Sequence, residues 1–343
     1  MKWIYDLPYD ELKEELTQTN FKKFVADQIV QWLYNKNNPE IDQWSNISKT
    51  DRERLAQSFN TRFSTVLTIA KDDEETRKFL IQLEDNQRIE SVLIPEKHHY
   101  TFCISTQAGC PLGCRFCATG KLGFQRNLTP GEIVSQVLIL KKELHDAIAY
   151  TGKLNLVFMG MGEPLLNYDN LKHALQTLTF EKGMNISPRN MTVSTAGILS
   201  ELQRLETDFP NIKISFSLNA SGSSLRETLM PISRKEKLNL LLDYFRNTKE
   251  KRKHRITFEY VLLKGVNDSL IHARKVSELI KGIPCKVNVI PYNENPALPF
   301  RTPPDETVDA FSDYLHSRGY TVIVRWSKGR TIRSACGQLA GEG

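Results

Sequence analysis

The chain has 343 residues, a formal net charge of +6 and 40% hydrophobic residues. This length is sufficient for one large domain with an appendage, or for two domains. The sequence has neither an apolar run of about 18 residues nor an apolar signal core near its start, so it predicts neither a membrane span nor secretion. Six cysteines without a leader instead favour the reducing cytoplasm, and the mild positive charge is compatible with a polyanionic partner.

Residues 1–75 have a helical pattern. Apolar side chains recur at helical spacing in its middle part, namely Phe21, Phe24, Val25, Ile29, Val30, Trp32 and Leu33. Because Lys22, Lys23 and Lys36 lie beside or after this stripe, two interpretations are open. The segment is either a small packing module or a helical accessory domain that contacts RNA.

A β-hairpin is expected within residues 76–97. Two strand patterns, 79–83 and 88–94, flank the turn residues Asp85 and Asn86. The hairpin places Glu90 on a strand just before the larger part of the chain.

Strand and helix patterns alternate from residue 98 to about residue 330, which is typical of an α/β fold with parallel strands. The expected strands are 101–105, 154–159, 191–194, 212–218, 256–263, 287–290 and 321–325. The expected helices lie near 130–146, 169–180, 198–207, 236–249, 270–280 and 305–317. Functional residues are expected at the carboxyl ends of these strands.

The most informative motif is the run Cys110, Cys114 and Cys117, with C-x3-C-x2-C spacing. Three thiolates can hold three irons of a [4Fe–4S] cluster and leave the fourth iron open. An open iron can bind S-adenosylmethionine (SAM) and reduce its sulfonium, which generates a radical. The spacing therefore predicts a cluster that cleaves SAM.

Two other uses of these cysteines fit less well. A zinc site normally takes four ligands in paired units, whereas Cys103, Cys285 and Cys336 are scattered singly. A disulfide framework is typical of small secreted chains.

Polar residues at strand ends extend the candidate site. Gly162 and Glu163 follow an apolar strand, and a carboxylate there can pair with the ammonium of a ligand. Ser194, Ser217 and Asn219 end two further strands and can hydrogen-bond a ribose or a carboxylate. Each signal is weak alone, because such residues are common at strand ends.

Cys336 lies near the carboxyl terminus. It follows a basic run formed by Arg325, Lys328, Arg330 and Arg333. Cationic neighbours lower the pKa of a thiol, and a glycine-flanked tail can carry the sulfur into an active site. The alternative is a small buried hydrophobe, as most free cysteines are. Cys103 has the same two interpretations.

The densest basic patch is the run 249–255. It is either a solvated helix end or a contact to an RNA backbone.

Six stretches together resemble the RlmN family of radical-SAM adenine carbon-2 RNA methyltransferases, over nearly the whole chain. They are 102–105, 109–120, 158–164, 193–197, 291–293 and 335–339. The resemblance implies a partial (βα)6 barrel in residues 98–330, preceded by the helical domain and a hairpin linker. A tail, 331–343, would then carry Cys336. Many members have His at the position of Asn219.

The resemblance also implies a role for each site residue. Cys110, Cys114 and Cys117 would hold the cluster. SAM would bind at Gly162, Glu163, Ser194, Ser217, Leu218, Asn219 and Asn293. Cys336 would take a methyl group from one SAM, and a second SAM would activate that group for addition to carbon 2. Glu90 would accept the carbon-2 proton, and Cys103 would resolve the covalent RNA adduct through a transient disulfide.

The implied substrates are an adenosine of 23S rRNA near the peptidyl-transferase centre and the adenosine beside the anticodon of certain tRNAs. A flavodoxin-like electron donor is expected, and the protein is expected to be a monomer in the cytoplasm. Three other activities are open: carbon-8 methylation of the same rRNA base with the same cysteines, radical chemistry on a substrate other than RNA, and non-catalytic RNA binding. The last leaves Cys103 and Cys336 unexplained.

Overall fold

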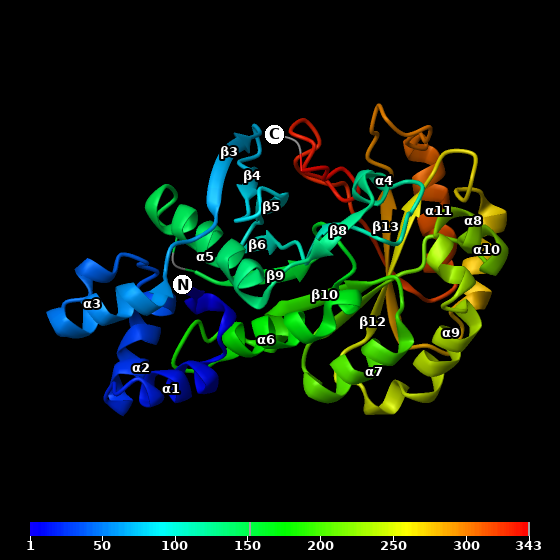
Figure 1. Ribbon diagram of the computed structural model, residues 1–343. Helices are drawn as coiled ribbons and strands as arrows, with labels where there is room; N and C mark the ends of the chain where they lie inside the picture. The colour runs from blue at the N-terminus through cyan, green and yellow to red at the C-terminus, as the bar shows by residue number, and fades with distance from the viewer. Residues whose placement is uncertain (151, 342–343) are drawn as a thin grey trace.

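A ten-stranded sheet runs through the molecule in the order β14-β13-β12-β11-β10-β9-β6-β5-β4-β3 (Figure 1). The computed structural model describes residues 1–150 and 152–341, so the predicted tail residues 342 and 343 lie outside the described part. The strands from β6 to β14 pair in parallel, and those from β3 to β6 pair antiparallel. The strands are β3 (Thr65–Lys71), β4 (Arg77–Gln82), β5 (Arg88–Pro95), β6 (Tyr100–Cys103), β9 (Leu154–Phe158), β10 (Met191–Thr195), β11 (Lys213–Ser217), β12 (Ile256–Leu262), β13 (Cys285–Pro291) and β14 (Thr321–Val324).

The parallel strands form a partial barrel with helices around its outside (Figure 1). Its strand–helix units within the described residues are β6–α5, β9–α6, β10–α7, β11–α9, β12–α10 and β13–α11, and β14 forms the edge. The helices are α5 (Pro130–Asp146), α6 (Tyr168–Thr179), α7 (Leu199–Asp208), α8 (Ser223–Leu229), α9 (Leu238–Asn247), α10 (Leu270–Leu279) and α11 (Asp305–Ser317). The predicted α/β fold is confirmed.

Local sequence explains where α5 begins. The Thr129 side chain accepts the amide of Glu132, and the Glu132 carboxylate accepts the amide of Thr129. Pro130 occupies the first helical position, where its missing N–H costs no hydrogen bond. Between β6 and α5 lies a small insertion composed of β7 (Gln107–Gly109), α4 (Ala118–Leu122) and β8 (Phe124–Asn127). It contains the three-cysteine motif.

The amino-terminal helices pack against α5. The Asp6 carboxylate accepts the Gly131 amide at 2.9 Å, and the Lys141 ammonium donates to the Tyr34 carbonyl at 2.8 Å. The helices are α1 (Tyr9–Gln18), α2 (Lys23–Val30) and α3 (Lys49–Ser58), and β1 (Lys2–Trp3) pairs with β2 (Phe59–Asn60) beneath them. Phe24, which the helical pattern assigned to the packed stripe, is exposed instead.

Short helical turns connect these elements. They are η1 (Ile4–Asp6), η2 (Gln31–Asn35), η3 (Ile41–Gln43), η4 (Pro164–Asn167), η5 (Pro188–Asn190), η6 (Pro231–Arg234) and η7 (Lys249–Lys251). No helix among the described residues is long and apolar enough to cross a membrane.

The hairpin is part of the main sheet. Strands β4 and β5 form the predicted hairpin, and β5 pairs with β6 of the barrel. Thr65–Lys71, which was expected to be helical, forms β3 on the outer side of β4. This segment is rich in β-branched residues, which favour strands. The division of the chain near residues 75, 97 and 330 stays a prediction.

Candidate active site

Glu90 and Cys103 lie on the same face of the sheet. Cα partners on neighbouring strands share a face, and side chains alternate between the two faces. Cys103 on β6 is the partner of Val92 on β5, and Glu90 precedes Val92 by two positions. Ser91 lies on the opposite face, where its hydroxyl donates to Gln136 of α5 at 2.7 Å. The sheet register therefore brings a carboxyl group and a thiol together, away from α5.

The same face continues along the parallel strands. β9 connects β6 to β10 in matching register. Ser194 on β10 pairs with Ser215 on β11, and Ser217 pairs with Glu259 on β12. The predicted residues on β10 and β11 therefore share the inner face of the barrel with Cys103.

The cysteine motif forms a loop that is held at its base by the pairing of β7 with β8. The Cys110 amide donates to the Gly123 carbonyl at 2.9 Å. Gly109 has a φ of +74°, and a Cβ at this position would lie 1.9 Å from the carbonyl oxygen of Gly123. Only glycine fits this close approach. Helix α4 begins directly after Cys117.

An apolar wall surrounds the cysteine loop. Its buried side chains are Leu112, Phe116, Ala196, Leu229, Met230, Leu263 and Tyr292. In this environment burial raises the pKa of the Cys110 thiol to about 12. Burial also raises the pKa values of Cys114 and Cys117. The free thiols are therefore neutral near pH 7, and iron binding reverses this because a coordinated thiol loses its proton.

Glu163 is buried, and its carboxylate is hydrogen-bonded within the chain. One oxygen accepts a backbone amide of the same turn at 3.2 Å, and the other accepts the Ala196 amide at 2.8 Å. Burial raises the pKa of Glu163, while the hydrogen bonds and Arg226 act in the opposite direction. Gly162 has a φ of +103°, and a Cβ there would lie 2.6 Å from the Cβ of Gln107. The turn therefore packs directly on β7.

Arg226 of α8 is a completely buried arginine that sequence reasoning missed. Its guanidinium donates to carbonyl oxygens at the ends of β10 and β11, namely those of Ala196 (2.7 Å), Ser217 (2.8 Å) and Leu218 (3.2 Å). Burial lowers the pKa of Arg226 to about 10, and the charges of Cys114 and Glu163 oppose this shift. One cation thus connects two strand ends with the cysteine loop and the glycine turn.

Asn219 has a left-handed backbone conformation, with φ of +54°. Asn and His adopt this region more readily than most residues, so the backbone at this position would accommodate either residue. The side-chain oxygen of Asn219 accepts the Val261 amide at 3.0 Å, and its carbonyl accepts the Asn267 side chain at 2.9 Å. The side chain of the preceding Leu218 is buried in the core, and the Leu218 amide donates to the Glu259 carbonyl at 3.0 Å.

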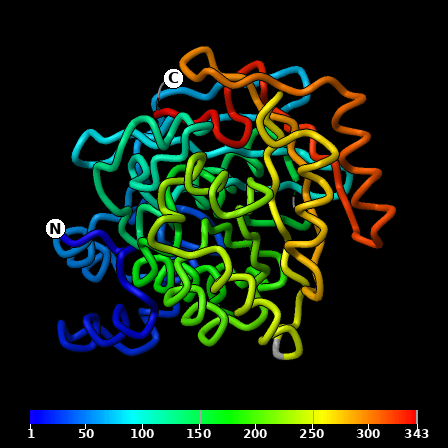
Figure 2. Tube along the Cα trace, turned by 90° about the vertical axis from the view of Figure 1, so that its right-hand side faces the viewer, coloured from blue at the N-terminus to red at the C-terminus, as the bar shows by residue number. Residues whose placement is uncertain are grey.

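The carboxyl-terminal tail folds back over the cysteine loop. The Gly337 carbonyl accepts the Ala118 amide at 2.8 Å, and the Leu339 carbonyl accepts the Thr119 hydroxyl at 2.6 Å. Figure 1 and Figure 2 both show the tail, in red, at the same end of the molecule as the hairpin in cyan.

Asn293, at the end of β13, holds the tail from the other side. Its side-chain nitrogen donates to the Cys336 carbonyl at 3.2 Å and to the Ser327 hydroxyl at 3.0 Å. The side-chain oxygen of Asn293 is buried and has no partner among the described residues. A buried acceptor of this kind is available to a donor on a bound ligand.

The Cys336 side chain is solvent-exposed, and its sulfur lies within electrostatic reach of both Cys117 and Cys103. The tail thereby brings one sulfur close to the cysteine loop and to β6. Burial also raises the pKa of the Cys103 thiol.

The basic run does not lower the pKa of Cys336 overall. Although the residue is exposed, protein atoms around the sulfur reduce its hydration and raise the pKa, the charge of Glu259 raises it further, and Arg325 of the run acts in the opposite direction. Lys328 instead donates to the Pro95 carbonyl at 2.6 Å, and Arg330 stacks on the ring of Trp326. Of the four residues of the basic run, Arg325 is the one that contributes to the pKa of Cys336.

Glu90 links the hairpin to the tail. One carboxylate oxygen forms an ion pair with Lys78 of β4, with 2.7 Å between the ammonium nitrogen and Oε1. The other oxygen accepts the amides of Ala340 at 2.7 Å and Gly341 at 3.1 Å. Lys78 was not singled out from the sequence, because its position on a strand gives no sign that its charge is buried.

Comparison with known proteins agrees with this geometry. A profile of the radical SAM superfamily matches residues 104–275, and one described as the ribosomal RNA large subunit methyltransferase N-terminal domain matches residues 3–60. Proteins named dual-specificity RNA methyltransferase RlmN from Syntrophus aciditrophicus and Solidesulfovibrio magneticus are 42% and 44% identical, over 99% of this chain and 96% of each relative. The chain belongs to the RlmN family. A radical SAM methyltransferase of known structure from Sphaerobacter thermophilus has a TM-score of 0.96 and 38% identity, with 100% of both chains covered.

Membership of the RlmN family implies a [4Fe–4S] cluster and SAM. No three His, Cys, Asp or Glu side chains among the described residues are grouped to hold a single metal ion. A [4Fe–4S] cluster needs no such group, because each thiolate binds a different iron. Three thiols in one loop with an apolar wall suit this cluster, and the unpartnered oxygen of Asn293 suits a polar ligand beside it.

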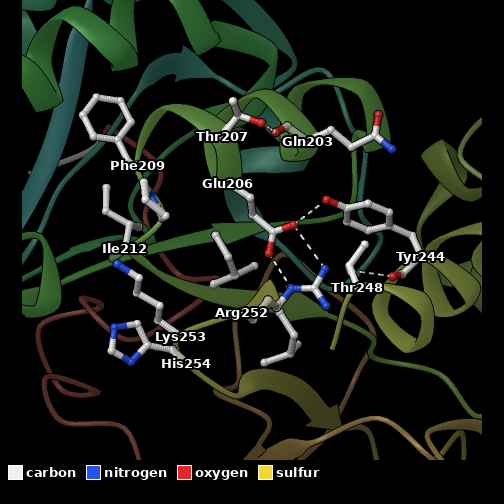
Figure 3. A pocket seen from close by; sticks show the side chains of 13 residues that line it. Gln203, Glu206, Thr207, Phe209, Ile212, Tyr244, Thr248, Arg252, Lys253 and His254 are labelled. Atoms are coloured by element: carbon white, nitrogen blue, oxygen red, sulfur yellow. Dashed lines mark hydrogen bonds and ion pairs between the residues drawn. The ribbon is translucent and has the colours of Figure 1, made fainter. Parts of the chain in front are cut away.

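The basic run 249–255 lies away from the RlmN cysteine loop, at the amino ends of β11 and β12. A cavity of about 300 Å³ there is lined by Glu206, Tyr244 and Arg252, among others (Figure 3). Glu206 pairs with Arg252 and accepts the Tyr244 hydroxyl at 2.6 Å. Because Glu206 neutralises the charge of Arg252 within the protein, this arginine adds little positive charge to the surface of the run. The side chain of Lys251 lies outside the described part, and RNA contact by the run stays a hypothesis.

Proposed function

We propose that this chain methylates carbon 2 of a specific adenosine in the peptidyl-transferase region of 23S rRNA, and of the adenosine next to the anticodon in some tRNAs. Relatives named dual-specificity RNA methyltransferase support this substrate class. The observation that carries the proposal is the packing of the tail on the cysteine loop: the Gly337 carbonyl, next to Cys336, accepts the Ala118 amide, next to Cys117, at 2.8 Å. Cys336 also lies within electrostatic reach of Cys117 and Cys103. Neither non-catalytic RNA binding nor radical chemistry on another substrate requires a tail cysteine at this place.

In this proposal, Cys110, Cys114 and Cys117 hold the cluster through their thiolates. The SAM contacts are Gly162, Glu163, Ser194, Ser217, Leu218, Asn219 and Asn293. When bound, the cluster and SAM supply an electron, a methyl group and a deoxyadenosyl radical. Because both Glu163 oxygens already accept backbone amides, we assign Glu163 to shaping the binding turn as well as to charge.

Cys336 is the proposed methyl carrier. Carbon 2 of adenine lies between two ring nitrogens and is electron-poor, so it does not attack the methyl group of SAM directly. The Cys336 sulfur can do so once it has lost its proton: a sulfur–carbon bond forms as the sulfonium–methyl bond breaks. Since the pKa of this thiol is raised, the step requires a proton acceptor near neutral pH.

Glu90 and Cys103 are proposed to complete the reaction once the former methyl carbon links Cys336 to the base. The adduct that radical addition forms has one unpaired electron, which would return to the bound cluster that supplied it, and Glu90 accepts the proton that leaves carbon 2. The Cys103 thiolate then attacks the Cys336 sulfur, which forms a disulfide, breaks the sulfur–carbon bond and leaves a carbon that takes a proton to become methyl. An external thiol reductant restores both cysteines. The shared sheet face of Glu90 and Cys103 supports this pairing of tasks.

The target adenosine must leave its stack to reach this site. Proteins commonly read RNA in loops whose bases can be splayed out, and both proposed substrates present the adenosine in such a context. We further propose that the enzyme is a cytoplasmic monomer that receives electrons from a flavodoxin-like donor.

The proposal is tested with protein purified without oxygen, reconstituted with iron and sulfide, and supplied with SAM. Intact mass should show one added methyl group, mapped to Cys336. After reduction, incubation with a 23S rRNA fragment or a tRNA transcript should yield 2-methyladenosine. Cys336→Ala should abolish both signals, whereas Cys285→Ala, a change at a buried cysteine at the start of β13, should leave both.

The product distinguishes the alternatives. Formation of 8-methyladenosine would assign the carbon-8 activity instead. Turnover of SAM with no methyl group on Cys336 or on RNA would indicate radical chemistry on another substrate.

A further inference from the structure

The ion pair between Lys78 and Glu90 is enclosed by protein. The side chains of Lys78 and Glu90 are 7% and 1% exposed, and 2.7 Å separates the ammonium nitrogen from Oε1. Lysine is almost never this buried unless it is paired. On the hairpin, Lys78 is the Cα partner of Val92, and Glu90 is the partner of Leu80. Lys78 and Glu90 are therefore diagonal neighbours on one face, a separation that a long side chain spans.

The pair opens onto a cavity of about 600 Å³, a size in the range of ligand pockets. Its walls include Lys78 and Glu90 of the hairpin, Ala118 and Lys121 of α4, and Gln338 and Ala340 of the tail. Arg333 lines it as well. Apart from Glu90, the charged groups that the described residues contribute to this wall are cationic, which suits a nucleotide that carries phosphate. The ion pair thus faces a space that can receive a substrate.

The two oxygens of the Glu90 carboxylate have different partners. Oε1 contacts Lys78, which belongs to the same sheet as Glu90. Oε2 accepts the amides of Ala340 and Gly341, which belong to the tail. If the tail amides release Oε2, Lys78 still holds Oε1. An arginine would reach both oxygens with its planar fork, whereas lysine is a point charge.

We propose that Lys78 is the positioning residue of the proton transfer at Glu90. It holds Oε1 in place through the ion pair. Oε2 can then give up its hydrogen bonds to the tail amides and accept the proton from carbon 2. The C–H bond at carbon 2 breaks, the proton bonds to Oε2, and the electron pair stays in the purine ring. Lys78 takes no part in the transfer of the proton itself. This inference rests on the proposed role of Glu90.

The test separates the two stages of the reaction. Lys78→Met removes the charge at similar length, and Lys71→Met is the matched control, because Lys71 on the adjacent strand forms an exposed pair with Glu75. Each holoenzyme is assayed for the methyl group on Cys336 by intact mass and for 2-methyladenosine formation on a tRNA transcript. For Lys78→Met we expect normal methylation of Cys336. On RNA we expect at least about a tenfold lower kcat, because a general base contributes roughly 100- to 10,000-fold, with little change in KM.

Lys78→Met should also accumulate a denaturant-resistant adduct between the protein and RNA, because the carbon-2 proton stays in place. Lys78→Arg should not restore kcat, since its fork occupies both oxygens. In a Glu90→Gln background, Lys78→Met should cause little further loss, because the two residues act as a unit.

An unchanged kcat in Lys78→Met would overturn the inference. So would loss of the methyl group on Cys336, which would indicate a role in folding, and so would additive losses in the double variant. If Lys78→Met folds poorly alone, the comparison of Glu90→Gln with the double variant still tests whether Lys78 acts through Glu90. Failure of the unaltered enzyme to methylate RNA would instead refute the proposed function.

Discussion

Replacement of Arg226 by Met should strongly destabilise the protein. Arg226 is completely buried, and its guanidinium donates to three backbone carbonyls at the ends of β10 and β11. Each buried acceptor left without a donor costs about 1–3 kcal/mol, and breaking a buried charge arrangement by removing one partner costs roughly 3–5 kcal/mol. Because these costs overlap, we expect a total loss of about 4 kcal/mol. Arg226→Lys should cause part of this loss of stability, since lysine replaces a fork of five donors with one nitrogen.

The assay is thermal unfolding of the anaerobic holoenzyme, followed by circular dichroism, with iron content measured on the same samples. The entropy of unfolding is about 2.1 cal/mol/K per residue, so in a chain of 343 residues a loss of 1 kcal/mol lowers Tm by about 1.4 °C, and Arg226→Met should lower Tm by roughly 6 °C. The matched control is Arg204→Met, because Arg204 forms exposed pairs with Asp169 and Glu201, which contribute at most about 1 kcal/mol. Equal Tm values for the Arg226 and Arg204 variants would refute the reasoning.

Two further predictions concern the cysteine loop and the barrel interior. Gly109→Ala should lower the iron content far more than Gly113→Ala, because a Cβ at Gly109 meets a carbonyl oxygen at 1.9 Å while a Cβ at Gly113 meets nothing within 4 Å; equal iron contents would contradict this. Burial raises the pKa of Glu259 above its ordinary 4.5, so the folded state holds its proton more tightly than the unfolded state, and this contribution is full below the ordinary pKa and lost as pH rises through the folded pKa. Glu259→Gln should therefore reduce the loss of unfolding free energy as pH rises above 4.5, by about 1.4 kcal/mol per unit of pKa shift. Denaturant unfolding measured over this pH range checks it, and an unchanged pH dependence would show that Glu259 does not cause the loss.

The fold was predictable because short strands with buried apolar side chains alternate with amphipathic helices along the chain. The start of α5 was equally local, because Thr129 and Glu132 cap the helix within four residues. The segment Thr65–Lys71 was wrongly expected to be helical because its own sequence carries a weak strand pattern. That strand is an edge strand with mostly exposed side chains, so its alternation lacks the apolar signal of a buried strand.

The polar interior of the site was much less predictable. The cysteines were found from spacing, and the strand-end residues from family resemblance. Arg226 was missed because its acceptors Ala196 and Ser217 lie on other elements, and a charge is buried only where such distant partners exist. The pKa of Cys336 was mispredicted for the same reason, since Glu259, a strong influence on the sulfur, is far away in sequence.

The antiparallel register of β5 limits which insertions and deletions this family can tolerate. Glu90 faces the cavity while its neighbour Ser91 contacts α5. When the register of a strand shifts by one residue, every side chain moves to the opposite face of the sheet. Loss or gain of a single residue between the hairpin turn and Glu90 would therefore direct the carboxyl group into the packed face and the serine toward the substrate. The number of residues between the hairpin turn and Glu90 is therefore itself a requirement of this site.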